Sequence, residues 1–236
     1  MAFSRKQFVS LTALGVSAAA LGADRKADAA SDQRAPVHFR VLKPGQYDRA
    51  LMMKKLGVNK ANKQVFQSVS PLVVAPGVAS VYIHMQNSMN AYQFSFDQGA
   101  GSLATLAVFI GPSIVLGLND AMWRKYRFGD ALKLAQTNIY YRATSNLNAS
   151  ASPDDPNGMY QDWSAQAVAK RGGSFMVCHN ATSAIAAMFA GKSGRSANSV
   201  LADFERNLLP EFQMVPAGVA AVQMAQDHGW QLYPII

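Results

Sequence analysis

Apolar positions in the second half of the chain recur with two alternating patterns. Short runs in which nearly every residue is apolar, such as residues 103–110 and 175–178, are typical of strands buried on both faces. Each run is followed by a longer stretch in which apolar residues recur with helical spacing. The alternation predicts an α/β fold, a three-layer α/β/α sandwich around a mostly parallel five-stranded sheet.

The expected elements begin at Gly77. We expect strands at residues 78–85, 103–110, 175–178, 212–216 and 231–233. We expect helices at residues 88–96, 113–126, 181–190, 198–208 and 218–228. The alternation fails in residues 127–172, and residues 146–158 are rich in turn formers. This insertion is too long for an ordinary connection, and we expect either a lid that closes through aromatic contacts or a solvated addition.

The first residues have the pattern of an export signal. A charged start around Arg5 and Lys6 precedes an apolar stretch, residues 9–21, that is too short for a stable membrane span. A cleavage site of the small-x-small type follows at residues 27–29. The start resembles a twin-arginine signal with lysine as the second basic residue, so we expect a periplasmic protein exported by the twin-arginine or the general secretion route. A retained anchor is the alternative.

The domain organisation follows from these patterns. Residues 1–29 are expected as a signal peptide, residues 30–76 as an N-terminal arm, and residues 77–236 as one α/β domain with the insertion 127–172. Removal of the signal takes away four basic and two acidic residues and lowers the formal charge from +8 to +6. The remaining basic residues are scattered and do not alternate with aromatics, so the pattern does not favour nucleic acid as a partner.

Cys178 is the one cysteine of the chain and lies where an apolar run changes into a helical pattern. The free N–H groups at the start of a helix favour the thiolate, the form that attacks electrophiles and carries sulfur. A single cysteine excludes an intramolecular disulfide. The alternative is a small, inert, buried residue.

Further candidates are polar residues near the carboxyl ends of the expected strands, where open α/β sheets bind ligands. His84 is expected to end a strand next to that of Cys178 and is the preferred spatial partner of the thiol. The other candidate ligand-binding residues are Asn87, Asn90, His179 and Asn180. Helix capping by the asparagines and a core position for either histidine are the alternatives.

Several function classes lack their motifs. The chain has no C-x-x-C, H-E-x-x-H, G-x-S-x-G, phosphate-loop or dinucleotide glycine pattern. Its eleven methionines form no cluster with histidine, which favours core packing over a copper site. We therefore expect no cofactor and no metal, and a carrier or binding protein rather than a classical enzyme.

Three segments together resemble the DsrE-like family. They are residues 83–94, the sequence Val177-Cys178-His179-Asn180, and residues 211–219 followed by 226–230. In that family a strand that ends in a cysteine opens a helix, and a later strand reaches a Val-Pro-x-Gly-Val turn. The resemblance covers residues 77–236 and implies an α/β/α fold that assembles as dimers, trimers or hexamers. Some members relay sulfur as a persulfide on the cysteine that Cys178 matches.

Two hypotheses follow. In the first, an exported DsrE-like protein handles sulfur with Cys178 as persulfide carrier or thiol acceptor, between a donor and an acceptor thiol. In the second, a non-catalytic oligomeric module binds a small ligand or soft metal at the same sheet edge. Both hypotheses include a homo-oligomer and exclude stable insertion into a membrane.

Overall fold

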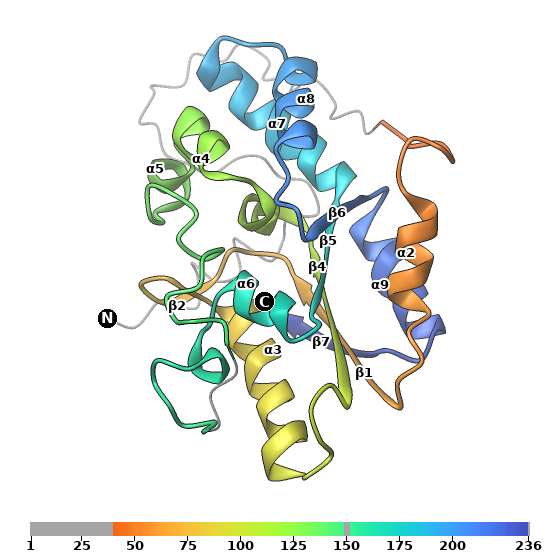
Figure 1. Cartoon of the computed structure of the whole chain (residues 1–236). Helices are drawn as coiled ribbons and strands as arrows, with labels where there is room; N and C mark the ends of the chain where they lie inside the picture. The colour runs from red at the N-terminus through yellow and green to blue at the C-terminus, as the bar shows by residue number, and fades with distance from the viewer. Residues whose placement is uncertain (1–39, 149–151, 236) are drawn as a thin grey trace, which may run out of the picture.

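A five-stranded parallel sheet forms the centre of the molecule in the computed structural model, which describes residues 40–148 and 152–235 (Figure 1). The strand order is β6-β5-β4-β1-β7, and each neighbouring pair is parallel. The predicted three-layer α/β/α sandwich is confirmed. The strands are β1 (Asn62–Ser68), β4 (Leu103–Phe109), β5 (Ser174–Cys178), β6 (Phe212–Val215) and β7 (Gln231–Ile235).

Helices cover both faces of this sheet. The α-helices are α2 (Arg49–Leu56), α3 (Ser80–Asn90), α4 (Asp120–Tyr126), α5 (Phe128–Leu132), α6 (Ala165–Lys170), α7 (His179–Ser193), α8 (Ala197–Arg206) and α9 (Gly218–Asp227). A π-helical turn, η1 (Ala91–Ser95), extends α3, and two 3-10 segments are η2 (Gly111–Gly117) and η3 (Met159–Gln161). The strands β2 (Val73–Ala75) and β3 (Val78–Ala79) form a separate antiparallel hairpin.

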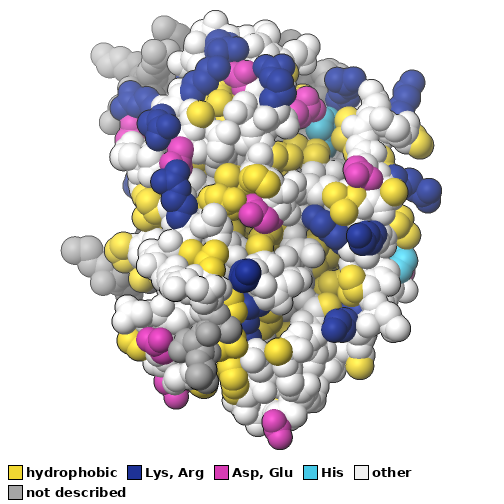
Figure 2. Space-filling model, in the orientation of Figure 1, with side chains coloured by type: hydrophobic (Ala, Val, Ile, Leu, Met, Phe, Trp, Pro, Cys, Tyr) yellow, Lys and Arg dark blue, Asp and Glu magenta, His cyan; other side chains and the backbone are white. Residues whose placement is uncertain are grey.

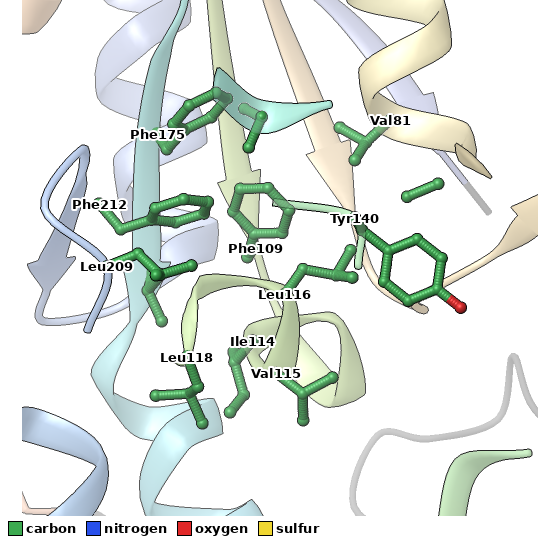
Figure 3. Close-up of a cluster of buried hydrophobic side chains, with 14 of the residues drawn as sticks. Val81, Phe109, Ile114, Val115, Leu116, Leu118, Tyr140, Phe175, Leu209 and Phe212 are labelled. Atoms are coloured by element: carbon green, nitrogen blue, oxygen red, sulfur yellow. The ribbon is translucent and has the colours of Figure 1, made fainter. Parts of the chain in front are cut away.

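Alternate residues of the interior strands β1, β4 and β5 belong to two separate cores. In β4, Leu106 and Val108 pack in the core beneath α2 and α9, whereas Ala107 and Phe109 pack in the larger core on the opposite face. The larger core contains stacked rings of Phe175 and Phe212, whose centroids lie 4.6 Å apart (Figure 3). Burial on both faces explains why β4 and β5 are nearly continuous apolar runs in the sequence.

The strand predicted at residues 78–85 is wrong. Only Val78 and Ala79 are extended, and α3 begins at Ser80. The buried apolar residues that follow, Val81, Tyr82, Met85 and Met89, recur with spacings of one to four residues, which places them on one helical face. The fifth strand of the sheet comes from another part of the chain.

That strand is β1, which lies within the expected N-terminal arm. β1 pairs with β4 on one side and β7 on the other, so it is an interior strand of the sheet. Helix α2 also comes from the arm, and its Met52 and Leu56 are buried against the sheet. The predicted boundary between arm and domain at Gly77 is therefore wrong. The predicted signal peptide, residues 1–29, lies outside the described residues.

The insertion 127–172 is packed rather than solvated over much of its length. It contains α5, η3 and α6, and its Phe128 and Tyr140 are buried in the larger core. Its end contacts α3 through the fully buried side chain of Gln86, whose amide donates to the carbonyls of Met159 and Asp162. Within residues 40–148 and 152–235, no helix is long and apolar enough to cross a membrane.

Candidate functional site

Cys178 lies at the carboxyl end of β5 and is the N-cap residue of α7. Its Sγ accepts a hydrogen bond from the backbone N–H of Ala181 at 3.3 Å. The side chain of the next-turn residue Thr182 donates to the carbonyl of Cys178 at 2.8 Å. The thiol therefore takes the place of the serine or aspartate oxygen that usually caps a helix, and only 4% of the residue is exposed.

A second strand-to-helix junction packs against the thiol. The backbone N–H of Asn180 donates to the carbonyl of Pro216, which joins the start of α7 to the turn between β6 and α9. A Cβ at Gly218 would lie 3.0 Å from the Cβ of Cys178 and 2.5 Å from Cγ1 of Ile110. Only glycine fits at this position, so steric crowding explains the glycine of the Val-Pro-x-Gly sequence after β6.

Backbone groups dominate this edge of the sheet. Residues 110–119, 178–191 and 212–226 contain no aspartate, glutamate, lysine or arginine. The described residues also include no group of three or more histidine, cysteine, aspartate or glutamate side chains that could hold a metal ion. Negative charge on the sulfur would be met by the N–H groups at the start of α7.

Two hollows in the surface lie apart from Cys178. An open groove of about 420 Å³ separates the β2–β3 hairpin from residues 133–140. A small apolar pocket of about 30 Å³ lies between η2, α5 and α7 and includes Pro112 and Ile185. Since neither hollow includes Cys178, and the thiol is nearly fully buried, a reagent reaches it only if it is small or if the edge opens locally.

His84 does not lie beside Cys178, which corrects the expected pairing. It belongs to α3, and its ring centroid lies 5.3 Å from that of Tyr233 on β7. Strands β4 and β1 separate β7 from β5 in the sheet. The expectation failed because residues 80–85 form a helix, so His84 cannot mark the end of a strand.

The two asparagines of α3 also lie away from the thiol. Asn87 is exposed on α3. Asn90 donates to the carbonyl of Tyr160 at 3.0 Å and accepts from Nη1 of Arg171 at 2.6 Å, so it holds the insertion. Neither residue reaches the carboxyl end of β5 as the predicted pocket requires, because the predicted first strand is a helix.

The two residues after Cys178 lie in different surroundings. His179 is fully buried, and its Nε2 lies 3.1 Å from a carboxylate oxygen of Glu205 on α8. Its Nδ1 has no hydrogen-bond partner among the described residues. Asn180 stays at the sheet edge through its backbone and is partly exposed. Of the candidate ligand-binding residues, the structure brings Asn180 alone beside Cys178 within the described chain.

Sequence reasoning missed a polar cluster around Arg171. Its guanidinium donates to the side-chain oxygens of Gln86, Asn90 and Gln93 and lies 4.8 Å from the ring centre of Tyr160. Burial lowers the pKa of Arg171 to about 10. The spacing of the three amides, four and three residues apart, is a helical polar stripe and was the available signal.

Comparisons with known proteins found no match for this chain. No protein-family model matches the chain, and no curated protein or solved structure matches it significantly.

Proposed function

We propose that the protein handles sulfur through Cys178, as a persulfide carrier or thiol acceptor. The observation that carries the proposal is the position of Sγ as the N-cap acceptor of α7, where the N–H of Ala181 meets it. Helix-start N–H groups stabilise negative charge on sulfur, and both a thiolate and a persulfide anion carry such charge. The DsrE-like resemblance of residues 77–236 supports the same role.

The proposed relay involves two sulfur transfers. The Cys178 thiolate attacks the sulfane sulfur of a donor persulfide or polysulfide, a new S–S bond forms, the donor S–S bond breaks, and the donor leaves as a thiolate or shortened polysulfide. An acceptor thiolate then attacks the terminal sulfur and releases the Cys178 thiolate. One S–S bond forms and one breaks in each step, so no external oxidant or reductant is needed.

Burial of the thiol sets a condition on this chemistry. Cys178 is 4% exposed, and Gly218 and Ile110 lie close to it. Room for an added sulfur atom and for an acceptor thiol requires movement at the start of α7 or α9. We therefore expect small polysulfides to load the thiol faster than bulky persulfides.

The alternative is a non-catalytic oligomeric module that binds a small ligand or soft metal at this edge. The observation that favours it is the same burial, because a cysteine that caps a helix and is nearly inaccessible can serve structure alone. In that case Cys178 reacts slowly with thiol reagents.

Intact-mass spectrometry distinguishes the two functions. The protein is incubated with polysulfide, with sulfide alone, and with polysulfide followed by cyanide, which removes sulfane sulfur. A gain of whole sulfur atoms that appears only with polysulfide and is reversed by cyanide supports the carrier. Sulfide alone gives no gain because a persulfide formed from it needs an oxidant.

Cys178→Ser is the matched control, because serine retains the helix cap and removes the thiol. It should fold and gain no sulfur. An unloaded wild-type protein whose Cys178 is also slow to alkylate would exclude the carrier and favour the binding module. We further propose export to the periplasm, and the same spectra test it, since cleavage after Ala29 gives a mature chain that begins at Ala30.

A further inference from the structure

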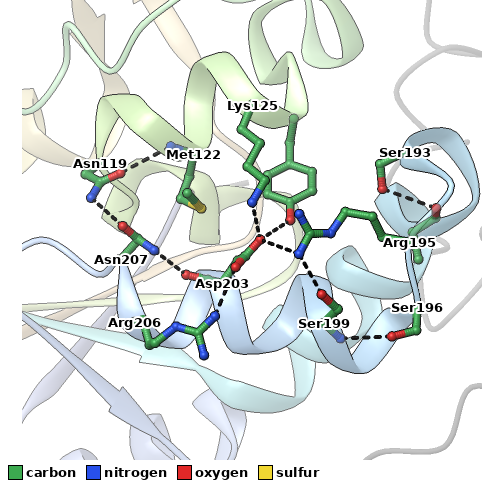
Figure 4. A network of polar contacts seen from close by, with 12 residues as sticks. Asn119, Met122, Lys125, Ser193, Arg195, Ser196, Ser199, Asp203, Arg206 and Asn207 are labelled. Atoms are coloured by element: carbon green, nitrogen blue, oxygen red, sulfur yellow. Dashed lines mark hydrogen bonds and ion pairs between the residues drawn. The ribbon is translucent and has the colours of Figure 1, made fainter.

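Three basic side chains converge on one carboxylate, that of Asp203 in α8 (Figure 4). Nζ of Lys125 lies 2.6 Å from Oδ2, and Nη2 of Arg195 lies 3.4 Å from the same oxygen. Nη2 of Arg206 lies 3.1 Å from Oδ1. The hydroxyl of Tyr126 donates to Oδ2 at 2.6 Å. The cluster joins α4 to α8 and to the turn before α8.

The cluster has more positive than negative charge. Hydrogen bonds from Lys125 and Tyr126 lower the pKa of Asp203 to about 2, so it is ionised at neutral pH. Burial and the hydrogen bond to Asp203 raise the pKa of Tyr126 to about 12, so it is neutral. Asp203 is the carboxylate with which the three cations form ion pairs within the described chain. Three positive charges and one negative charge leave a surplus of two.

Both arginines keep unused hydrogen-bond donors. The guanidinium of Arg195 uses Nη2 for Asp203 and for the hydroxyl of Ser199, and that of Arg206 uses Nη2 for Asp203. Their Nη1 and Nε groups form no hydrogen bond with residues that the structure describes. A guanidinium offers such groups as a planar fork that matches the oxygens of phosphate or sulfate.

The cations are accessible although the carboxylate is not. The exposed fractions of the side chains are 38% for Lys125, 36% for Arg195 and 68% for Arg206, against 10% for Asp203. Lysine and arginine side chains gather on the surface above α4, α7 and α8 (Figure 2). The three cations therefore lie at a surface that solvent reaches, next to a carboxylate that is nearly buried.

We propose that Lys125, Arg195 and Arg206 form a binding site for a doubly charged oxyanion of the phosphate or sulfate type. The surplus of two positive charges matches the charge of such a dianion, and the free guanidinium donors match its oxygens. The site does not involve Cys178, so it is independent of the proposed sulfur chemistry.

The test is titration of the intact protein with inorganic phosphate and with sulfate by calorimetry, at constant ionic strength set with sodium chloride. Arg195→Gln and Arg206→Gln should each weaken phosphate binding by about ten-fold, because each removes charge-assisted hydrogen bonds. Arg124→Gln is the matched control. Arg124 is 63% exposed on the same helix as Lys125 but faces Asp120, so its loss should change binding less than about two-fold.

Asp203→Asn gives a change in the opposite direction. It removes the competing negative charge, so the folded variant should bind phosphate more tightly than the wild type, with folding checked by circular dichroism. Vesicles of phosphatidylcholine with and without phosphatidic acid distinguish a free oxyanion from a lipid headgroup. Binding to either source that depends on Arg195 and Arg206 supports the site. No binding to either source, or equal loss in Arg124→Gln, overturns it.

Discussion

Gly218 shows how much one missing side chain decides at the residue scale. Because Gly218 has no side chain, the first turn of α9 packs closely against Ile110 and Cys178. A Cβ at this position would lie 2.5 Å from Cγ1 of Ile110. Contacts of this length force backbone or side-chain shifts in a packed core. The position of the thiol between two helix starts therefore depends on a glycine forty residues further along the chain.

We predict that Gly218→Ala destabilises the protein by about 1–3 kcal/mol, the usual range for overpacking. Urea unfolding measures the change, and alkylation of Cys178 should become faster because the junction opens. Gly191→Ala is the control, since an added Cβ there meets no atom within 4 Å in the helix α7. It should leave stability unchanged or raise it by about 0.5–1 kcal/mol. Equal stability of both variants would contradict the steric argument.

At the element scale, α3 holds the insertion 127–172 through its polar stripe. Gln86 is fully buried and uses its amide N–H groups for the carbonyls of Met159 and Asp162 and its oxygen for Arg171. All three partners lie in the insertion. The helix therefore has an apolar side toward the sheet and an amide side toward residues 159–171.

Replacing Gln86 with leucine should release this contact. The buried carbonyls and the Arg171 guanidinium lose their partner, which we expect to cost roughly 1–3 kcal/mol. Limited proteolysis should then cleave the insertion sooner than in the wild type. Asn87→Leu is the control, because Asn87 is the next residue on α3 and is exposed. If both variants resist protease like the wild type, Gln86 does not hold the insertion.

The edge strand of the sheet, β7, has a proline on its unpaired side. The carbonyl of Ile235 in β7 accepts from the N–H of Val69, so Ile235 faces β1, and its neighbour Pro234 faces the free edge. A proline there breaks no hydrogen bond within the sheet and removes a donor from the open side. The proline therefore disfavours pairing of β7 with a further strand on its open side.

At the scale of the whole molecule, the N-terminal segment completes the fold. Helix α2 covers one face of the sheet, and Nζ of its Lys55 donates to the carbonyl of Phe175 in β5 at 3.2 Å. Burial lowers the pKa of Lys55 from its ordinary 10.5 to about 8. This lysine therefore reports on the docking of α2 through the pH dependence of stability.

The sign of that dependence follows from proton binding. Between pH 8 and 10 the unfolded lysine keeps its proton while the folded one loses it, so the unfolded state binds more protons and this contribution to stability rises with pH. The difference in unfolding free energy between wild type and Lys55→Met should rise from pH 8 to pH 10. Lys54→Met, at the adjacent exposed position, is the control variant. If the difference in unfolding free energy between wild type and Lys55→Met does not change with pH, the amine of Lys55 is exposed to water in the folded protein.

Much of this architecture could be predicted from local patterns. The apolar runs at β4, β5 and β6 are buried on both faces, and the change of period at Cys178 marks a true junction between strand and helix. Such patterns can be recognised in the sequence because helical or extended periodicity depends on residues that are close together in the chain. The α/β/α class and the place of the thiol at a helix start were within reach for that reason.

The sequence by itself determined the layers, the parallel sheet and the position of Cys178 at a helix start. Only the tertiary structure decided that residues 62–68 rather than 78–85 enter the sheet, that His84 lies against Tyr233, and that Gly218 packs on the thiol. It also brought Lys125, Arg195 and Arg206 to one carboxylate. The physical reason is that periodicity records whether a residue is buried, whereas its partner depends on contacts between segments far apart in the chain.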